Sequence, residues 1–143
     1  MPLALVTSVE IRITNALQDV ALVHRLLADL AVTHGLPSGT VADMNVALDE
    51  VLSNIIKYGY TDSNRHEISI RFMVSTLELT AEVEDDGRPF DPLSVPPPEL
   101  HKPLAERKIG GLGIHFLRTI LTEVGYCRAG DRNRLVLKKS LAQ

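Results

Sequence analysis

The amino-acid sequence predicts an α+β protein, a two-layer sandwich in which helices cover one face of a mixed, mainly antiparallel sheet. Segments that alternate apolar and polar residues occur near both ends and in the middle of the chain. Segments with apolar residues every three or four positions lie between them. The resulting order is strand, helix, helix, strand, strand, long loop, helix, strand, strand. Amphipathic helices in such an order need a sheet face to cover.

Length and composition indicate one domain over residues 1–143 with a single core. There is no Trp and few aromatic residues, so Leu, Val, Ile and Ala must form that core. The net charge of -3 argues against direct nucleic-acid binding through the phosphate backbone. No apolar stretch approaches the ~20 residues of a membrane span, and the apolar start is a poor signal peptide. We expect a cytoplasmic protein with no membrane contact, and a buried structural thiol at Cys127.

The first third of the chain predicts one strand and two helices. Residues 9–13 alternate as a strand, and Thr14 or Asn15 is expected to cap the following helix. That helix ends at His34 and Gly35, because glycine is common just past a helix C-terminus. A second helix is expected from Ser38 to about residue 58.

Two strand patterns follow, at residues 67–74 and 77–83, and a short turn between them predicts a hairpin. Residues 92–108 contain five prolines and are expected to form a long loop, a lid over a binding site. A third helix is expected from Gly111, broken by Gly125. Residues 126–128 and 135–138 then suggest a closing hairpin around residues 130–133.

Glu50 and Asn54 lie four residues apart on the second helix and therefore share one face, which Lys57 extends. A solvated polar stripe would show the same spacing. The chemical alternative is more specific. The Asn side-chain oxygen is a ligand of the kind that Mg²⁺ prefers, and a carboxylate one turn earlier can serve as a general base.

Asp85, Asp86 and Gly87 end a strand pattern, where Asp and Gly are also ordinary turn residues. A carboxylate at this place can accept a hydrogen bond from a ligand donor such as the exocyclic amine of adenine. Glycines 110, 111 and 113 open the third helix, whose N-terminus is suited to binding anions. A flexible hinge is the alternative. The glycine pattern is neither a Walker loop nor a dinucleotide fingerprint.

Taken together, these three segments resemble the N, G1 and G2 boxes of the Bergerat-fold ATPases. The N box is residues 50–60, the G1 box residues 85–92 and the G2 box residues 110–114. Within that group the chain is most similar to the bacterial anti-sigma factor serine kinases. Pro89 departs from the pattern, because many relatives have a second glycine there, and Tyr58 stands where many have His.

The resemblance implies ATP and Mg²⁺ as cofactors and gives a role to each matching position. Asn54 would ligate Mg²⁺, and Glu50 would be the catalytic base for a substrate serine. Asp85 would bind the adenine amine, and Arg107 or Lys108 would meet the γ-phosphate. The full expected nucleotide-binding set is Asn54, Lys57, Asp85, Gly87, Phe90, Arg107, Lys108, Gly110, Gly111, Leu112 and Gly113.

The resemblance also implies two protein partners. These are a sigma factor, which the protein would sequester, and an anti-sigma antagonist whose serine it would phosphorylate. A homodimer through the apolar side of residues 9–13 is a further expectation. Two alternatives stay open: a nucleotide-gated interaction module without significant kinase activity, and a fragment of a larger fused system.

Overall fold

The computed structural model describes residues 6–89 and 111–141, with side chains from His115 onward in the second range. The predicted lid at residues 92–108 therefore lies outside the described residues, as do Phe90 and Gly110. The elements are β1 (Thr7–Thr14), the 3-10 turn η1 (Leu17–Asp19), α1 (Val20–His34), α2 (Ser38–Tyr58), β2 (Glu67–Val74), β3 (Glu78–Asp85), α3 (Gly111–Ile120), β4 (Glu123–Ala129) and β5 (Arg132–Ser140).

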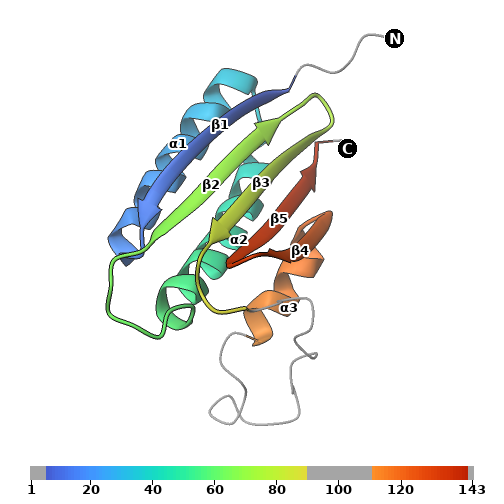
Figure 1. Cartoon of the computed structure of the whole chain (residues 1–143). Helices are drawn as coiled ribbons and strands as arrows, with labels where there is room; N and C mark the ends of the chain where they lie inside the picture. The colour runs from blue at the N-terminus through green and yellow to red at the C-terminus, as the bar shows by residue number, and fades with distance from the viewer. Residues whose placement is uncertain (1–5, 90–110, 142–143) are drawn as a thin grey trace.

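The strands form one five-stranded sheet in the order β1-β2-β3-β5-β4. Every pairing between these strands is antiparallel. Figure 1 shows the three α-helices on one face of this sheet, which confirms the predicted two-layer α+β fold. The predicted sheet was mixed, but the described strands contain no parallel pair. None of the helices in these residues has the length and apolar character needed to cross a membrane.

Most of the predicted boundaries are confirmed. Helix α1 ends at His34 because Gly35 adopts the left-handed conformation, at φ 63°, and its N–H bonds to Ala31 O. The β2–β3 hairpin closes at Ser75, whose hydroxyl accepts hydrogen bonds from the backbone N–H groups of Leu77 and Glu78. Both turns use residues whose local chemistry could be inferred from the sequence.

Three local expectations were wrong. The Thr14 hydroxyl does not cap a helix but donates to Asp19 Oδ2 at 2.7 Å, and Asn15 binds the segment before β2. Gly125 does not break α3, which ends at Ile120; it lies inside β4. Cys127 is exposed, because β4 is an edge strand whose residues are only partly covered.

The core lies between the inner face of the sheet and the apolar sides of the helices. Phe72 is its only fully buried aromatic residue among the described side chains. Aliphatic residues supply the rest, as the composition predicts. The largest fully buried aliphatic side chains are Leu27, Met44, Leu48, Leu52, Ile68, Ile70, Leu79, Leu117 and Leu137.

Removing one of these side chains tests the packing. Leu48 on α2 is 0% exposed, so Leu48→Ala should lower the free energy of unfolding by about 2–5 kcal/mol. Val32 on α1 is 86% exposed, and Val32→Ala is the control, with an expected change within about 0.5 kcal/mol. Urea unfolding measures both. Equal effects of the two substitutions would contradict the assignment of the core.

Candidate nucleotide site

Glu50 and Asn54 form a direct contact on α2. Asn54 Nδ2 donates a hydrogen bond to Glu50 Oε1 at 3.1 Å, and both residues are half-buried. The predicted shared face is therefore confirmed, whereas Lys57 is exposed. Among the described residues no group donates to Asn54 Oδ1. The pair thus presents a held carboxylate and a free neutral oxygen ligand on one helix face.

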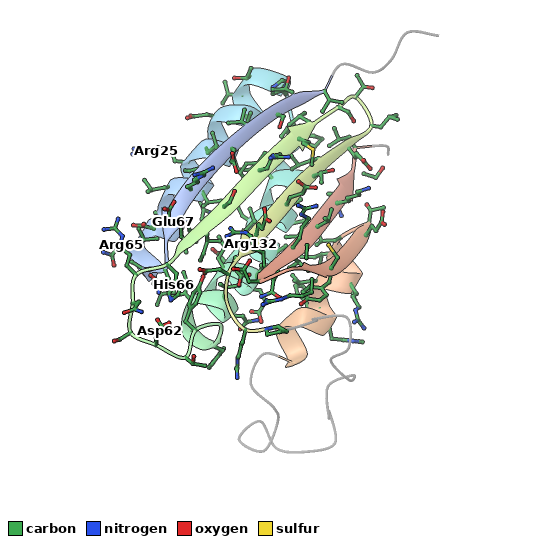
Figure 2. The ribbon with its side chains drawn as sticks, in the orientation of Figure 1. Arg25, Asp62, Arg65, His66, Glu67 and Arg132 are labelled. Atoms are coloured by element: carbon green, nitrogen blue, oxygen red, sulfur yellow. The ribbon has the colours of Figure 1, made fainter. Side chains whose placement is uncertain are left out.

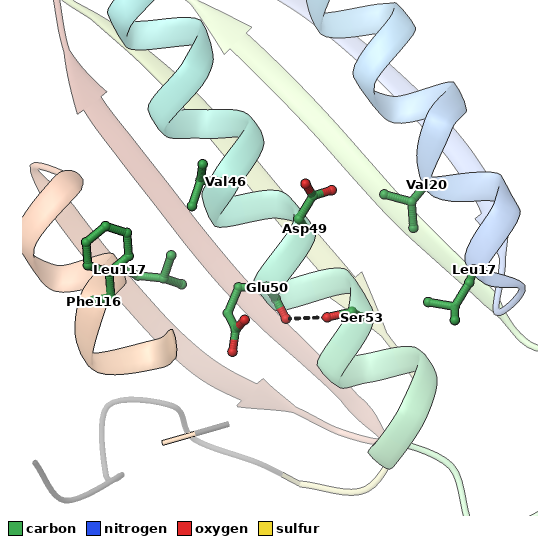
Figure 3. Close-up of a pocket in the computed structure, with 8 residues that line it drawn as sticks. All are labelled: Leu17, Val20, Val46, Asp49, Glu50, Ser53, Phe116 and Leu117. Atoms are coloured by element: carbon green, nitrogen blue, oxygen red, sulfur yellow. Dashed lines mark hydrogen bonds between the residues drawn. The ribbon is translucent and has the colours of Figure 1, made fainter. Parts of the chain in front are cut away.

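A hollow of about 460 Å³ lies beside Glu50, over the outer side of α2. Figure 3 shows the Glu50 side chain extending from α2 toward α3, with η1 and α1 on the other side. Most of the lining is apolar, and Leu17, Val46 and Phe116 are each about half exposed. The lining residues are Leu17, Val20, Val46, Asp49, Glu50, Ser53, Phe116 and Leu117.

Asp85 ends β3 and is only 4% exposed. Its Oδ1 accepts hydrogen bonds from Gly87 N–H at 2.8 Å and from Asn133 Nδ2 at 3.1 Å. No donor among the described residues contacts Oδ2. Burial raises the pKa of Asp85, and the hydrogen bonds from Asn133 and Gly87 oppose that rise. The free oxygen of a buried carboxylate is a strong acceptor for a ligand N–H group.

The turn after Asp85 packs directly against the end of α2. Arg88 N–H donates to Gly59 O at 2.8 Å. A Cβ atom added at Gly87 would lie 2.6 Å from Gly59 O and 2.8 Å from Asp85 Oδ1. Only glycine allows this approach, so the N-box segment and the G1 turn are joined through backbone groups.

A second set of polar residues meets this turn from the β4–β5 hairpin. Asn133 pairs with Asp85 across the sheet and is 7% exposed. Arg128 Nη1 donates to Gly87 O at 2.8 Å. Sequence patterns placed Asn133 only in a turn and gave Arg128 no role. The strand registers identify both residues: β3–β5 pairing places Asn133 opposite Asp85, and β4–β5 pairing places Arg128 opposite Asn133.

His66 lies beside the same turn, in the segment between α2 and β2, where Figure 2 labels it with Asp62. Its Nε2 is 2.8 Å from Asp62 Oδ1 and its Nδ1 is 3.1 Å from Asp86 Oδ1. The ring stacks on Tyr60 with centroids 4.1 Å apart. Carboxylates only accept hydrogen bonds. Both ring nitrogens can therefore donate to their carboxylate partners only when the imidazole ring is protonated. Asp62, chiefly, and Asp86 raise the pKa of His66.

The glycine cluster is only partly described. Gly111 begins α3, as predicted, and Gly113 lies in its first turn. Leu112 belongs to the same turn, but its side chain is not described. Phe90, Arg107, Lys108 and Gly110 lie outside the described residues, so their expected roles stay predictions.

Comparison with known proteins shows which protein family has this fold and these sequence features. The family of histidine kinase-like ATPase domains matches residues 13–139. The chain therefore belongs to this ATPase-domain family.

Several curated relatives carry one name. The chain is 28% identical over 120 residues to the serine-protein kinase RsbW of Bacillus velezensis, covering 81% of this chain and 75% of that protein. The serine-protein kinase RsbW of Listeria monocytogenes is 25% identical over 102 residues, or 68% of this chain and 65% of the relative. The Bacillus cereus protein of the same name is 27% identical over 120 residues, with 81% and 74% covered.

A solved structure shares the fold. It contains the RsbU and RsbW domains of a Mycobacterium tuberculosis protein and matches with a TM-score of 0.66 at 16% identity. The match covers 93% of this chain and 31% of that one. At this identity the match supports the fold and no further property.

Gly87→Ala tests the close approach of the two backbone segments. Its Cβ would meet a backbone carbonyl that cannot move aside, so we expect a loss of about 1–3 kcal/mol in the free energy of unfolding. Gly39→Ala on α2 is the matched control, because nothing lies within 4 Å of its added Cβ. That control should be neutral or stabilising by up to about 1 kcal/mol. Chemical denaturation compares them, and a stable Gly87→Ala variant would contradict the described turn.

The His66 cluster predicts a pH-dependent contribution to stability. The folded-state pKa lies above the unfolded value of about 6.5. The contribution is therefore fully present below about pH 6.5 and is lost as pH rises through the folded pKa. The difference in melting temperature between wild type and His66→Gln should shrink from about pH 6 to about pH 8.5.

A variant with both Asp62→Asn and Asp86→Asn is the control for this experiment. It removes the two carboxylates that face the ring and should flatten the pH dependence. A His66→Gln difference that grows with pH would have the wrong sign and would reject the assignment.

Proposed function

We propose that this protein is an ATP-dependent protein serine kinase that acts as an anti-sigma regulatory factor. It would phosphorylate a serine on an antagonist protein and sequester a sigma factor. The observation that carries the proposal is the half-buried Glu50 carboxylate, held by Asn54 beside an open apolar hollow. Relatives named as serine-protein kinases and membership of an ATPase-domain family support it.

The G1 turn fits the adenine end of the nucleotide. Asp85 Oδ2 is the proposed acceptor for the adenine amine, and the missing Cβ of Gly87 lets the turn beside it pack closely against the end of α2. The N-terminus of α3 at Gly111 and Gly113 would face the phosphates, since free N–H groups and the helix dipole favour anions. Lys57, Phe90, Arg107, Lys108, Gly110 and Leu112 complete the proposed nucleotide-binding set.

Asn54 is the proposed protein ligand of Mg²⁺. Its Oδ1 has no protein donor in the described residues and is the kind of oxygen that this ion accepts. No group of three or more His, Cys, Asp or Glu side chains in those residues is arranged to hold a metal ion. The phosphates and water would therefore supply the other ligands, and the ion would neutralise phosphate charge during transfer.

Glu50 is the proposed base. The substrate serine Oγ attacks the γ-phosphorus and forms a new O–P bond, while Glu50 accepts the hydroxyl proton. The bond from the γ-phosphorus to the bridging oxygen breaks, and its electron pair leaves with ADP. Asn54 Nδ2 donates to Glu50 Oε1 and so fixes the orientation of the carboxylate, leaving the other oxygen for the serine.

The surface around Glu50 suits a protein partner. Leu17, Val46 and Phe116 come from three elements and expose apolar surface at the rim of one hollow.

We include a homodimer in the proposal, since no described strand pairs with the outer edge of β1. A cytoplasmic location and no direct nucleic-acid contact complete it, the latter in keeping with a net charge of -3. The proposed unit is one domain.

Two substitutions on α2 separate chemistry from binding. Glu50→Gln keeps the side-chain shape but removes the proton acceptor, so phosphoserine formation on a candidate antagonist should fall by about two to four orders of magnitude. ATP affinity should be unchanged. Asn54→Ala should lose Mg-ATP affinity together with turnover. Mass spectrometry of the phosphorylated antagonist and a filter-binding assay with labelled ATP measure the two properties.

Glu67→Gln on the exposed end of β2 is the matched control and should be fully active. Normal phosphoserine formation by Glu50→Gln would remove the kinase role from that residue. ATP-dependent capture of the antagonist with no phosphoserine in the wild type would instead favour a nucleotide-gated interaction module. The exposed apolar hollow would serve that function equally well.

A further inference from the structure

Asn133 contacts the described part of the G1 turn through both atoms of its side-chain amide group. Its Nδ2 lies 3.1 Å from Asp85 Oδ1, 2.9 Å from Arg88 O and 3.4 Å from Gly87 O. Its Oδ1 accepts from the Tyr126 hydroxyl at 2.6 Å and from Arg128 Nη1 at 3.1 Å. One buried amide therefore connects the end of β3, the following turn and strand β4.

The chemistry of these partners fixes which way the amide points. Arg128 can only donate and the carbonyl oxygens of Gly87 and Arg88 can only accept, so Oδ1 must face β4 and Nδ2 must face the turn. Arg128 also donates to Gly87 O at 2.8 Å, which supports the turn a second time. Exchanging the two amide atoms would place Nδ2 against the Arg128 donor and Oδ1 against the carbonyl oxygens of Gly87 and Arg88.

This orientation determines what Asp85 offers to a ligand. The donors from Asn133 and Gly87 both go to Oδ1, which leaves Oδ2 as an acceptor. Both bonds favour the ionised carboxylate, against burial. Without Asn133 the buried group would bind a proton more readily and would then present a donor. A 6-amino purine needs an acceptor at this point, whereas a 6-oxo purine needs a donor.

We propose that Asn133, held by Tyr126 and Arg128, is the positioning residue that makes the site select adenine over 6-oxo purines. The inference rests on the proposed nucleotide binding at Asp85 and deepens it. Asn133 acts through Asp85 and need not touch the base. Three other groups also bear on the charge of Asp85 and are not substituted in the Asn133 variant: Asp86, Arg128 and the buried Tyr60 hydroxyl.

The test compares ADP with inosine diphosphate by calorimetry in wild type, Asn133→Ala and Tyr126→Phe. Wild type should bind ADP at least about tenfold more tightly than inosine diphosphate. Asn133→Ala should lower that ratio by about tenfold or more, mainly by weakening ADP. Tyr126→Phe removes only the hydroxyl that holds Asn133 Oδ1, and it should lower the ratio by a smaller factor. Asn64→Ala, at an exposed position, is the control.

A pH profile gives a readout that general loosening of the turn would not produce. ADP affinity should fall as the pH is lowered, because Asp85 loses its acceptor form when it binds a proton. The fall should begin at a higher pH in Asn133→Ala than in wild type, because the hydrogen bond from Asn133 lowers the pKa of Asp85. Circular dichroism confirms folding, and Tyr126→Phe keeps the test decisive if Asn133→Ala does not fold.

Failure of the proposed function and failure of the Asn133 inference would give different binding results. If wild type binds neither nucleotide, both the proposed function and this inference are wrong. If wild type selects ADP and the variants keep both the ratio and the wild-type pH profile, the inference alone is overturned. Equal loss of affinity for both nucleotides also overturns it, because that result shows a structural role without base selection.

Discussion

The backbone hydrogen bond from Arg88 N–H to Gly59 O is the contact on which the site depends. It joins the end of α2 to the turn after β3, at 2.8 Å. Helix α2 carries Glu50 and Asn54, and the turn follows Asp85, so this bond sets the spacing between the proposed catalytic and base-binding ends of the site. Gly87 is required because any Cβ there would collide with Gly59 O. The β4–β5 hairpin then holds the turn from the opposite side through Asn133 and Arg128.

Much of this arrangement could be predicted from local patterns. The bounds of α2, the β2–β3 hairpin and the Glu50–Asn54 pair each depend on residues close together in the chain, and each is confirmed. Two of the three failures have a common cause. Whether Gly125 breaks a helix or lies in a strand, and whether Cys127 is covered, depends on which strand forms the sheet edge. Asn133 was missed because its role exists only through the pairing of β5 with β3.

Two groups at the site make the folded state less stable than an apolar core would. Asp85 is an acid placed where burial raises its pKa, and Tyr60 beside it has a buried hydroxyl with no partner in the described residues. A core chosen only for stability would have neither. Perturbed and incompletely satisfied groups cluster at functional sites, because a ligand supplies what the protein leaves unpaired. Asp85 Oδ2 and Asn54 Oδ1 also accept no hydrogen bond from the described residues.

We propose that Asp85 Oδ2 and Asn54 Oδ1 lie at the two ends of one Mg-nucleotide site. Isothermal calorimetry of the wild-type chain with ATP, performed once with Mg²⁺ and once with EDTA, tests this proposal. We expect saturable binding of one nucleotide per chain with Mg²⁺ and markedly weaker binding without it. No heat and no shift in melting temperature under either condition would show that this site does not exist.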